Sequence, residues 1–367
     1  MKVLYYSGII LFFYYIYKNF YKNKGLRDVV SLWTKYHPDE ILDKKMLKIM
    51  LNNDTKVFKN LYQMYTLYNI NKISDFLNKH YSELNEKNTT KQIFLENKMN
   101  WLLNTPHNQF KNISHLPRNK WNIGLKKNNK LISLICVRPI KTIVFGVKMN
   151  SFYIDYECTH KNYRYKKLGT LMALKGIEEV VNSDFDSLFY IIDNRRYIQK
   201  HICVIKYYSL SLKNIKVKSN DLEPFSPKNI KQAFNLYVKL INKKKIYQLF
   251  TIKEFIYYFK PNNEFIYTFV SHKTLCLVHV QCVKYKSFYI KIPTISLFLT
   301  NGNHKKELKK VFDKLKELRF NNVIILNTYK IKKFKNKNFE GQSYVYNFNL
   351  KTKFKKVKPI NFGIPIF

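Results

Sequence analysis

The chain has 367 residues, of which 46% are hydrophobic and 16% aromatic. This composition excludes a disordered chain, and the length is enough for two domains of ordinary size, each with its own core. A formal net charge of +42 favours a polyanionic partner such as nucleic acid or an acidic membrane. However, the lysines are spread along the whole chain among Asn, Ile, Tyr and Phe, as in a protein from an A+T-rich genome. We therefore interpret most of them as solvated surface.

The five cysteines do not indicate a disulfide framework or a zinc site, because their number is odd and no CxxC pair occurs. We therefore expect a reducing compartment and a cytoplasmic location. The sequence also contains no HExxH, no GxSxG, no P-loop and no glycine-rich dinucleotide turn. These absences exclude the enzyme classes defined by those motifs, and we expect neither a metal nor a bound cofactor.

Residues 1–25 form a hydrophobic and basic segment. Residues 3–17 carry no charge, and residues 18–27 are basic. About 15 residues of helix span ~22 Å, less than the ~30 Å hydrocarbon core of a bilayer. Because Tyr and Phe suit the membrane interface, we expect residues 3–17 to associate with a membrane as a short anchor or an interfacial segment. The alternative is an aromatic helix packed on the body of the protein.

Apolar residues at helical spacing predict a helix over residues 58–81. Residues 151–157 alternate with a period of two, which predicts a strand, and the spacing from Leu168 onwards predicts a helix. The turn between them is basic. A basic turn that opens a helix presents free amides and the positive end of the helix dipole, so it suits a phosphate or pyrophosphate; the alternative is a solvated loop.

The second half of the chain repeats this order. We predict a strand at residues 187–192, a linker at 220–227, helices at 230–241 and 253–259, and strands at 265–271, 275–283 and 288–290. A long amphipathic helix at 305–318 and a strand at 323–326 follow. The last residues read FGIPIF. An ordinary terminus is polar and frays, so we expect this apolar end to be buried.

Residues 155–169 resemble the N-myristoyltransferase family. The family run Asn-Phe-Leu-Cys-Val-His-Lys-x-Leu-Arg-Ser-Lys-Arg-Leu-Ala aligns with them without a gap. Six positions are identical: Cys158, His160, Lys161, Arg164, Lys166 and Leu168. The same segment is similar to the acyl-CoA-binding signature of acetyltransferase-like folds. Weaker matches follow the family order before and after it. They imply a helix at residues 99–103 and a strand at residues 130–139, where KLISLICVRP stands in place of the family strand Lys-Leu-Val-Gly-Phe-Ile-Ser-Ala-Ile-Pro.

The resemblance implies an α+β fold of two acetyltransferase-like (GNAT-type) units, related by pseudo-twofold symmetry and forming a saddle-shaped mixed sheet flanked by helices. It implies an acyl-CoA-binding domain at residues 26–222 and a peptide-binding domain at 223–367. The implied reaction transfers a myristoyl group from myristoyl-CoA, as co-substrate, to the N-terminal glycine amine of a protein. The partners are myristoyl-CoA and proteins or peptides with an N-terminal glycine, and we expect a monomer.

The resemblance also assigns site residues. The Phe367 carboxylate would be the base, and the backbone amides of Tyr156 and Glu157 would form the oxyanion hole at a bulge in the central strand. The peptide site would include Tyr190 and Ser211. Acyl-CoA would contact Val30, Ser31, Leu32, Trp33, Cys158, Thr159, Arg164, Tyr165, Lys166, Lys167, Leu168 and Gly169.

Two departures from the family pattern leave other functions open. Ser211 stands where the family has Asn, and Glu157 where it has Leu. A catalytically degenerate protein that binds acyl-CoA or peptide on the same fold would account for this divergence. A nucleic-acid-binding protein would account for the charge. Of the three, we favour the acyltransferase.

Overall fold

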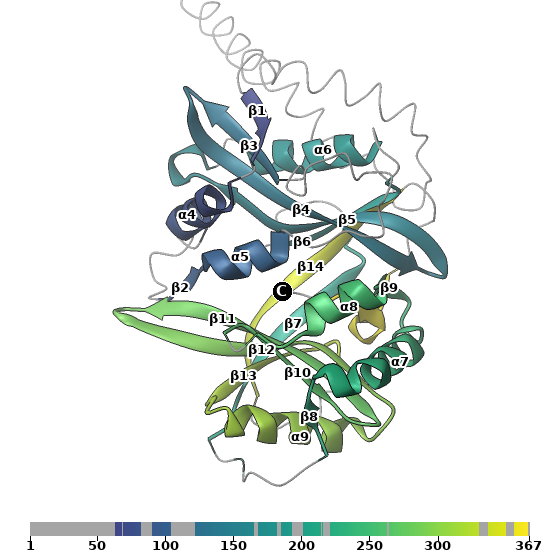
Figure 1. Ribbon diagram of the computed structural model, residues 1–367. Coiled ribbons are helices and arrows are strands. Elements are labelled where there is room, and N and C mark those ends of the chain that lie inside the picture. The colour runs from purple at the N-terminus through teal and green to yellow at the C-terminus, as the bar shows by residue number, and fades with distance from the viewer. Residues whose placement is uncertain are drawn as a thin grey trace, which may run out of the picture.

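The computed structural model (Figure 1) describes residues 63–67, 69–81, 90–103, 122–164, 168–181, 185–192, 201–213, 215, 221–262, 264–329, 337–349 and 356–365. The hydrophobic segment expected at residues 3–17 lies outside these ranges. Within them, no helix is long and apolar enough to cross a membrane.

One continuous mixed sheet forms the centre of the molecule (Figure 1). Along its main path the strands are β1 (Gln63–Thr66), β3 (Asn122–Lys127), β4 (Lys130–Val144), β5 (Val147–Thr159), β6 (Ser187–Ile192), β14 (Lys337–Asn349), β7 (Cys203–Ser211), β13 (Asn322–Leu326), β12 (Phe288–Thr300), β11 (Thr274–Tyr285), β10 (Ile266–Val270) and β8 (Glu223–Pro224). Off this path, β2 (Thr90–Ile93) pairs with β11, and β9 (Ile246–Leu249) pairs with both β4 and β15 (Phe362–Gly363).

Helices cover both faces of the sheet in each half. They are α4 (Ile70–His80), α5 (Glu96–Leu103), α6 (Leu168–Val181), α7 (Ile230–Ile241), α8 (Ile252–Phe259) and α9 (His304–Glu317). Successive residues of a strand point to opposite faces. Accordingly Leu134 and Cys136 of β4 pack with α4 and α5, whereas Ile135 lies under Gly176 of α6. In the second half Leu277 packs with α7 and α8, and Val278 packs with α9.

The two halves have the same plan. The series β3, β4, β5, α6, β6, β7 is repeated as β10, β11, β12, α9, β13, β14, and the pair α4, α5 is repeated as α7, α8. Counted inwards from β3 or from β10, the equivalent strands follow each other in the same order. At the centre, β14 lies between β6 and β7. The protein therefore has the predicted α+β fold of two acetyltransferase-like units with pseudo-twofold symmetry, and the two units exchange strands at the centre.

Helices α5 and α8 connect the two units. The Trp101 ring of α5 lies parallel to the Tyr257 ring of α8, with centroids 6.3 Å apart. The Tyr257 hydroxyl donates a hydrogen bond to the Trp101 carbonyl at 2.6 Å, and Trp101 Nε1 donates to the Tyr257 carbonyl at 3.4 Å. These reciprocal contacts tie the two helices together at the middle of the molecule.

Most predicted elements of the second half match the structure, including the helix at Ile230–Ile241. Three predictions need correction. The helix predicted over residues 58–81 begins only at Ile70, because Gln63–Thr66 pairs with β3 as an edge strand and Asn69 caps the helix. The strand predicted at residues 288–290 continues to Thr300. Part of the predicted linker is strand β8, paired with β10, and Phe225 beside it is buried.

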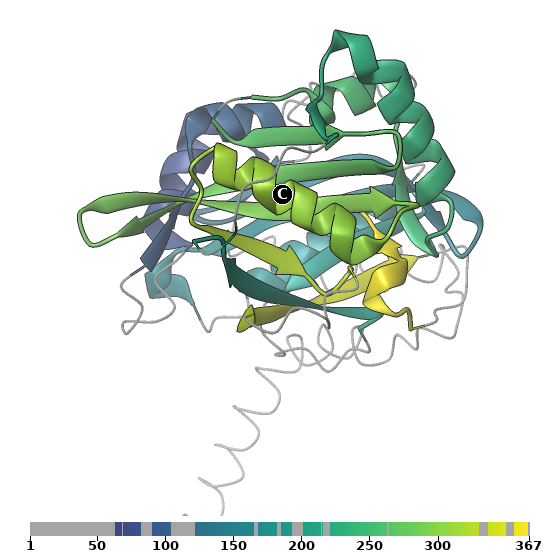
Figure 2. The same ribbon diagram turned by 90° about the horizontal axis from the view of Figure 1, so that it is seen from below.

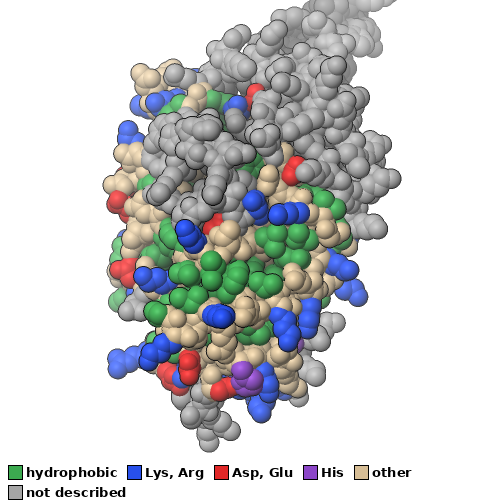
Figure 3. All heavy atoms as spheres, turned by 45° about the vertical axis from the view of Figure 1, so that its right-hand side comes forward, with side chains coloured by type: hydrophobic (Ala, Val, Ile, Leu, Met, Phe, Trp, Pro, Cys, Tyr) green, Lys and Arg blue, Asp and Glu red, His purple; other side chains and the backbone are tan. Residues whose placement is uncertain are grey.

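The chain has 66 Lys and Arg residues against 24 Asp and Glu residues. In the view of Figure 3, Lys and Arg side chains are scattered around a central hydrophobic area and do not form one continuous basic surface. This distribution agrees with the interpretation of most lysines as solvated surface.

Candidate functional site

A bulge interrupts β5 at the middle of the sheet. On the β4 side Cys136 pairs with Tyr156 and Val137 pairs with Ile154, so Asp155 is an extra residue on β5. A bulge breaks the regular alternation of backbone N–H groups between the two edges of a strand. Two successive amides can then be directed at one oxygen atom, as an oxyanion hole requires. The predicted oxyanion-hole residues, Tyr156 and Glu157, directly follow the bulge.

Beside this bulge, β5 and β6 separate. Their parallel pairing ends at Ile154 and Tyr190, although β5 continues to Thr159 and β6 to Ile192. Strand β6 remains paired with β14 up to Ile192. Among the described residues, β5 therefore continues from residue 155 to 159 beyond the end of its pairing with β6.

A buried ion pair holds the bulge in place. The side chains of Arg138 and Asp155 are 1% and 3% exposed. Arg138 Nε donates to Asp155 Oδ2 and Arg138 Nη2 to Asp155 Oδ1, both at 3.0 Å. Burial raises the pKa of the Asp155 carboxyl, and the Arg138 guanidinium opposes that rise; the bidentate geometry is that of an ionised pair.

The same guanidinium reaches the second unit. Arg138 Nη1 donates to the hydroxyl of Tyr258 on α8 at 3.1 Å, and the guanidinium carbon lies 5.3 Å from the centroid of that ring. The conformation of the bulge is thus connected to α8 through a single buried side chain.

Two of the side chains that follow the bulge lie in the core of the protein. Tyr156 and Cys158 are buried in the core formed with α4 and α5, where the Tyr156 ring meets the edge of Phe94 at 5.2 Å between centroids. Burial raises the pKa of the Cys158 thiol to about 12. The thiol is protonated at neutral pH and is therefore a poor nucleophile.

The basic turn connects this strand to α6. The His160 amide donates to the Ile132 carbonyl at 2.8 Å, and its ring centroid is 4.1 Å from that of His80. The Arg164 side chain donates to the carbonyls of Thr159, at 3.4 Å, and His80. Arg164 therefore fixes the turn to the C-terminal end of α4, a structural role that the sequence did not predict.

The other residues predicted to contact acyl-CoA are only partly described. Leu168 is the first residue of α6 and is buried, and Gly169 beside it is half-buried. Thr159 is the last residue of β5 and is half-buried. These three and Arg164 lie at the strand-to-helix turn. The residues that lie outside the described part of the chain are Tyr165, Lys166, Lys167 and the predicted contacts at 30–33.

The described part of the C-terminal segment, up to residue 365, is built into the body of the protein, as predicted. Phe362 and Ile364 are buried, and the Lys245 amide donates to the Asn361 carbonyl at 2.9 Å. A Cβ at Gly363 would lie 2.7 Å from Ile241 Cδ1 and 3.2 Å from Tyr247 Cβ, so only glycine fits there without a shift of its neighbours.

The direction of this segment is informative. Phe362 and Gly363 run parallel to β9. Strand β9 runs antiparallel to β4, with Ile246 opposite Val144 and Leu249 opposite Lys141. Beyond Gly363 the chain is therefore directed along β4 towards Arg138 and the bulge. Phe367 itself lies outside the described residues.

The two predicted peptide-site residues are far apart. Tyr190 lies opposite Ile154, next to the bulge. Ser211 is exposed at the opposite end of β7, where it pairs with Asn322. Along β14, Tyr346 is level with Tyr190, and Lys337 is level with Leu210. The structure does not bring Ser211 into one site with Tyr190.

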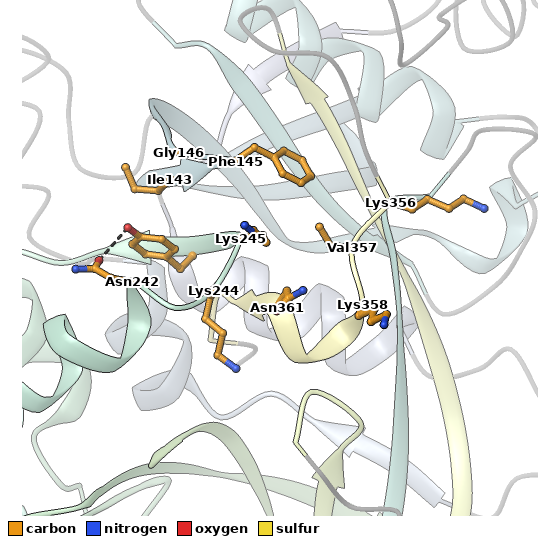
Figure 4. A pocket seen from close by; sticks show the side chains of 11 residues that line it. Ile143, Phe145, Gly146, Asn242, Lys244, Lys245, Lys356, Val357, Lys358 and Asn361 are labelled. Atoms are coloured by element: carbon orange, nitrogen blue, oxygen red, sulfur yellow. Dashed lines mark hydrogen bonds between the residues drawn. The ribbon is translucent and has the colours of Figure 1, made fainter. Parts of the chain in front are cut away.

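A pocket of about 710 Å³ lies at the other end of β4, beside its hairpin with β5 (Figure 4). Its lining includes four lysines: Lys244, Lys245, Lys356 and Lys358. Figure 4 shows that the side chains of Lys244 and Lys356 point away from each other. Because these charges do not converge and the pocket lies far along β4 from the bulge, we do not assign the reaction to it.

Sequence reasoning missed the Arg138–Asp155–Tyr258 network, although an arginine within the apolar run of β4 was a signal that it has a buried partner. It also missed a second bulge. Leu277 pairs with Leu297 and Val278 with Ile295, so Ser296 is an extra residue on β12, at the position equivalent to Asp155. Among the described residues, no three His, Cys, Asp or Glu side chains are grouped as metal ligands.

The fold consists of two acetyltransferase-like units with a bulge in the central strand of the first. A family model for the N-terminal domain of myristoyl-CoA:protein N-myristoyltransferase matches residues 44–185. Glycylpeptide N-tetradecanoyltransferase from Saccharomyces cerevisiae is 25% identical over 196 residues, which cover 46% of this chain and 40% of the yeast enzyme. Over residues 44–185 the chain is thus similar to the N-terminal domain of N-myristoyltransferases, and its match spans about two fifths of the length of the yeast enzyme.

Solved structures agree at the level of the fold. The yeast N-myristoyltransferase with bound myristoyl-CoA superimposes with a TM-score of 0.68 at 16% identity, covering 81% of this chain and 80% of the yeast chain. A protein of Enterococcus faecalis described as a probable N-acyltransferase gives a TM-score of 0.50 at 9% identity, covering 79% of this chain and 72% of its own.

Proposed function

We propose that this protein transfers a myristoyl group from myristoyl-CoA to the N-terminal glycine amine of protein substrates. The observation that carries the proposal is the bulge in β5. It places two successive backbone amides, those of Tyr156 and Glu157, on a strand whose neighbour has separated from it, just before the basic turn that opens α6. A carbonyl bound there and a phosphate bound at the helix start suit the two ends of an acyl-CoA thioester.

The reaction needs no side-chain nucleophile. The substrate amine attacks the thioester carbon, the carbonyl oxygen takes up negative charge, and the carbon–sulfur bond breaks to release the coenzyme thiolate. The amides of Tyr156 and Glu157 stabilise the oxyanion, and donors of this kind typically contribute ~3 kcal/mol or more each. Before the attack, one proton of the glycine ammonium passes to a base, which we propose is the carboxylate of Phe367. The second proton leaves the nitrogen when the intermediate collapses and is taken up by the departing thiolate.

The course of the C-terminal segment supports this choice of base. Gly363 is level with Ile143 of β4 through Tyr247, and the bulge begins opposite Val137. In an extended conformation, the four residues that follow Gly363 would span about 13 Å of the roughly 20 Å between these two levels. A main-chain carboxylate directed this way can approach the bulge without a catalytic side chain.

We propose that the two units bind different substrates, as in the sequence-based prediction. Residues 26–222 would bind acyl-CoA, and residues 223–367 would bind the peptide. Tyr190 remains in the proposed peptide site because it stands beside the bulge. The position of Ser211 on β7 supports only a contact with a part of the peptide that lies far from Tyr190.

The test is direct. The purified chain is incubated with labelled myristoyl-CoA and a peptide that begins with glycine, and the acylated peptide is detected by mass. A peptide with an acetylated N-terminus is the control, because it lacks the attacking amine. Myristoylation of the first peptide alone supports the proposal. Tight binding of myristoyl-CoA without transfer to any glycine peptide would instead indicate the degenerate binding protein.

A further inference from the structure

The hairpin of β11 and β12 extends well beyond the body of the protein in both views (Figures 1 and 2). Its turn contains only two residues, Lys286 and Ser287, with Lys286 in the left-handed region at a φ of 53°. Next to the turn are the two most exposed large hydrophobic side chains of the described chain, Phe288 at 68% and Tyr289 at 65%. The next residue in the sequence, Ile290, is 43% exposed. An exposed apolar group of this kind at a protruding tip indicates a binding surface.

One face of this hairpin is apolar. Residues directly opposite each other on two strands lie on the same face. Tyr285 pairs with Phe288 and Val283 pairs with Ile290, so all four side chains share one face. Tyr285 and Val283 are half-buried, whereas Phe288 and Ile290 are exposed.

The other face is basic. Lys284 pairs with Tyr289 across the hairpin, and its Nζ lies 5.9 Å from the centroid of that ring. On the far side of Lys284, strand β2 places Lys91 directly opposite it, and Lys291 lies two residues beyond Tyr289 on the same face. Like charges opposite each other in a sheet are destabilising, and residues 282–292 and 90–93 contain no Asp or Glu. An anionic partner would relieve this repulsion.

We propose that this hairpin docks onto a membrane surface that contains anionic phospholipids. The aromatic and aliphatic face enters the interfacial region, while the lysines on the other face reach lipid phosphates with their long side chains. A nucleic acid would also meet the charge, but bases bind by stacking on rings, and Val283 and Ile290 offer no ring. The continuous apolar face therefore favours a bilayer. This proposal is independent of the acyl transfer reaction.

A probe at the tip tests the proposal in the full-length chain. Ser287→Cys is labelled with a polarity-sensitive fluorophore, and the wild-type chain treated in the same way gives the background from native thiols. With phosphatidylcholine vesicles containing phosphatidylserine, we expect emission from the tip to shift to shorter wavelength. A label at Lys239→Cys, on the exposed side of α7, should not shift. Membrane binding through residues 3–17 alone would leave the tip in water and would overturn the proposal.

Vesicle partitioning separates the two faces. The double variant Phe288→Ser with Ile290→Ser should lower the affinity for anionic vesicles roughly tenfold or more. The double variant Lys284→Gln with Lys291→Gln should lower the affinity for anionic vesicles by a similar factor, but should leave the affinity for neutral vesicles unchanged. The matched controls are Val238→Ser with Ile252→Ser, at exposed hydrophobic positions elsewhere, and Lys231→Gln with Lys239→Gln. Equal losses in variants and controls, or a tip shift with an oligonucleotide but not with vesicles, would contradict the proposal.

Discussion

The guanidinium of Arg138 lies among the apolar side chains of β4, where an unpaired charge would be strongly destabilising. Its bidentate contact with Asp155 satisfies the charge and fixes the extra residue of the bulge. The N-myristoyltransferase pattern quoted above has Ile at the first of these positions and Asn at the second. At these two positions the chain therefore departs from that pattern.

Removal of one partner should be worse than removal of both. Arg138→Ile leaves a buried carboxylate without its counter-ion, so we expect a loss of 3–5 kcal/mol in the free energy of unfolding, roughly as for other buried pairs. The double variant Arg138→Ile with Asp155→Asn should recover most of that loss, because it removes both charges. Denaturant unfolding of the two single variants and the double variant measures this. Additive losses would show that the two side chains are not coupled.

At the scale of single elements, β5, the turn and α6 could be predicted from the sequence, because the change from a two-residue to a helical period is clear there. The bulge was implied only by the family resemblance, since one extra residue in a long strand does not alter composition or periodicity. The role of Arg164 in fixing the turn to α4 could not be predicted, because its carbonyl partner His80 lies more than eighty residues away in the sequence.

The structural role of Arg164 changes how phosphate binding by the basic turn should be tested. Replacement of Arg164 would also release the turn from α4, so Lys166→Ala with Lys167→Ala is the better variant. We expect it to weaken myristoyl-CoA binding roughly tenfold, as expected for the loss of two phosphate contacts at a helix start, with an unchanged unfolding midpoint. Titration of the ligand measures the affinity, and Lys305→Ala with Lys306→Ala at the start of α9 is the control. Unchanged affinity would remove the turn from the site.

The C-terminal segment gives a second prediction at this scale. A Gly-Ser extension after Phe367 would carry the terminal carboxylate away from the bulge, so transfer should be abolished while myristoyl-CoA binding persists. Phe367→Leu keeps both the carboxylate and an apolar side chain and should retain most activity. Rapid transfer by a stably folded, extended chain would exclude the C-terminus as the base.

Helix α5 contains a titrating group in the core. Lys98 is 5% exposed, its Nζ donates to the Val280 carbonyl at 3.3 Å, and burial lowers its pKa from 10.5 to about 8. Between pH 8 and 10.5 the unfolded chain still holds a proton that the folded protein has released, so stability rises with pH. At ~1.4 kcal/mol per pH unit, the free energy of unfolding of the wild type should rise by up to ~3 kcal/mol relative to that of Lys98→Met between pH 8 and 10.5. A constant difference between the two unfolding free energies would show that Lys98 does not titrate there.

At the scale of the whole molecule, the sequence shows two repeats of one order of elements, and the structure shows how they join. Each repeat contributes a bulged strand, at Asp155 and at Ser296, and strands β7 and β14 cross into the neighbouring unit. The pairing of β14 between β6 and β7 could not be predicted, because interactions between strands so distant in sequence leave no local pattern. The membrane-facing hairpin was hidden for a related reason, since its two faces emerge only from the register of three strands.

The central claim is that the thioester reacts at the bulge of β5, and the most direct measurement is a crystal structure with a non-hydrolysable myristoyl-CoA analogue. We expect the acyl carbonyl oxygen about 3 Å from the amide nitrogens of Tyr156 and Glu157, between β5 and β6, with the coenzyme phosphates at the start of α6. An analogue bound instead in the lysine-lined pocket beside Lys244, with the edge of β5 unoccupied, would contradict the account.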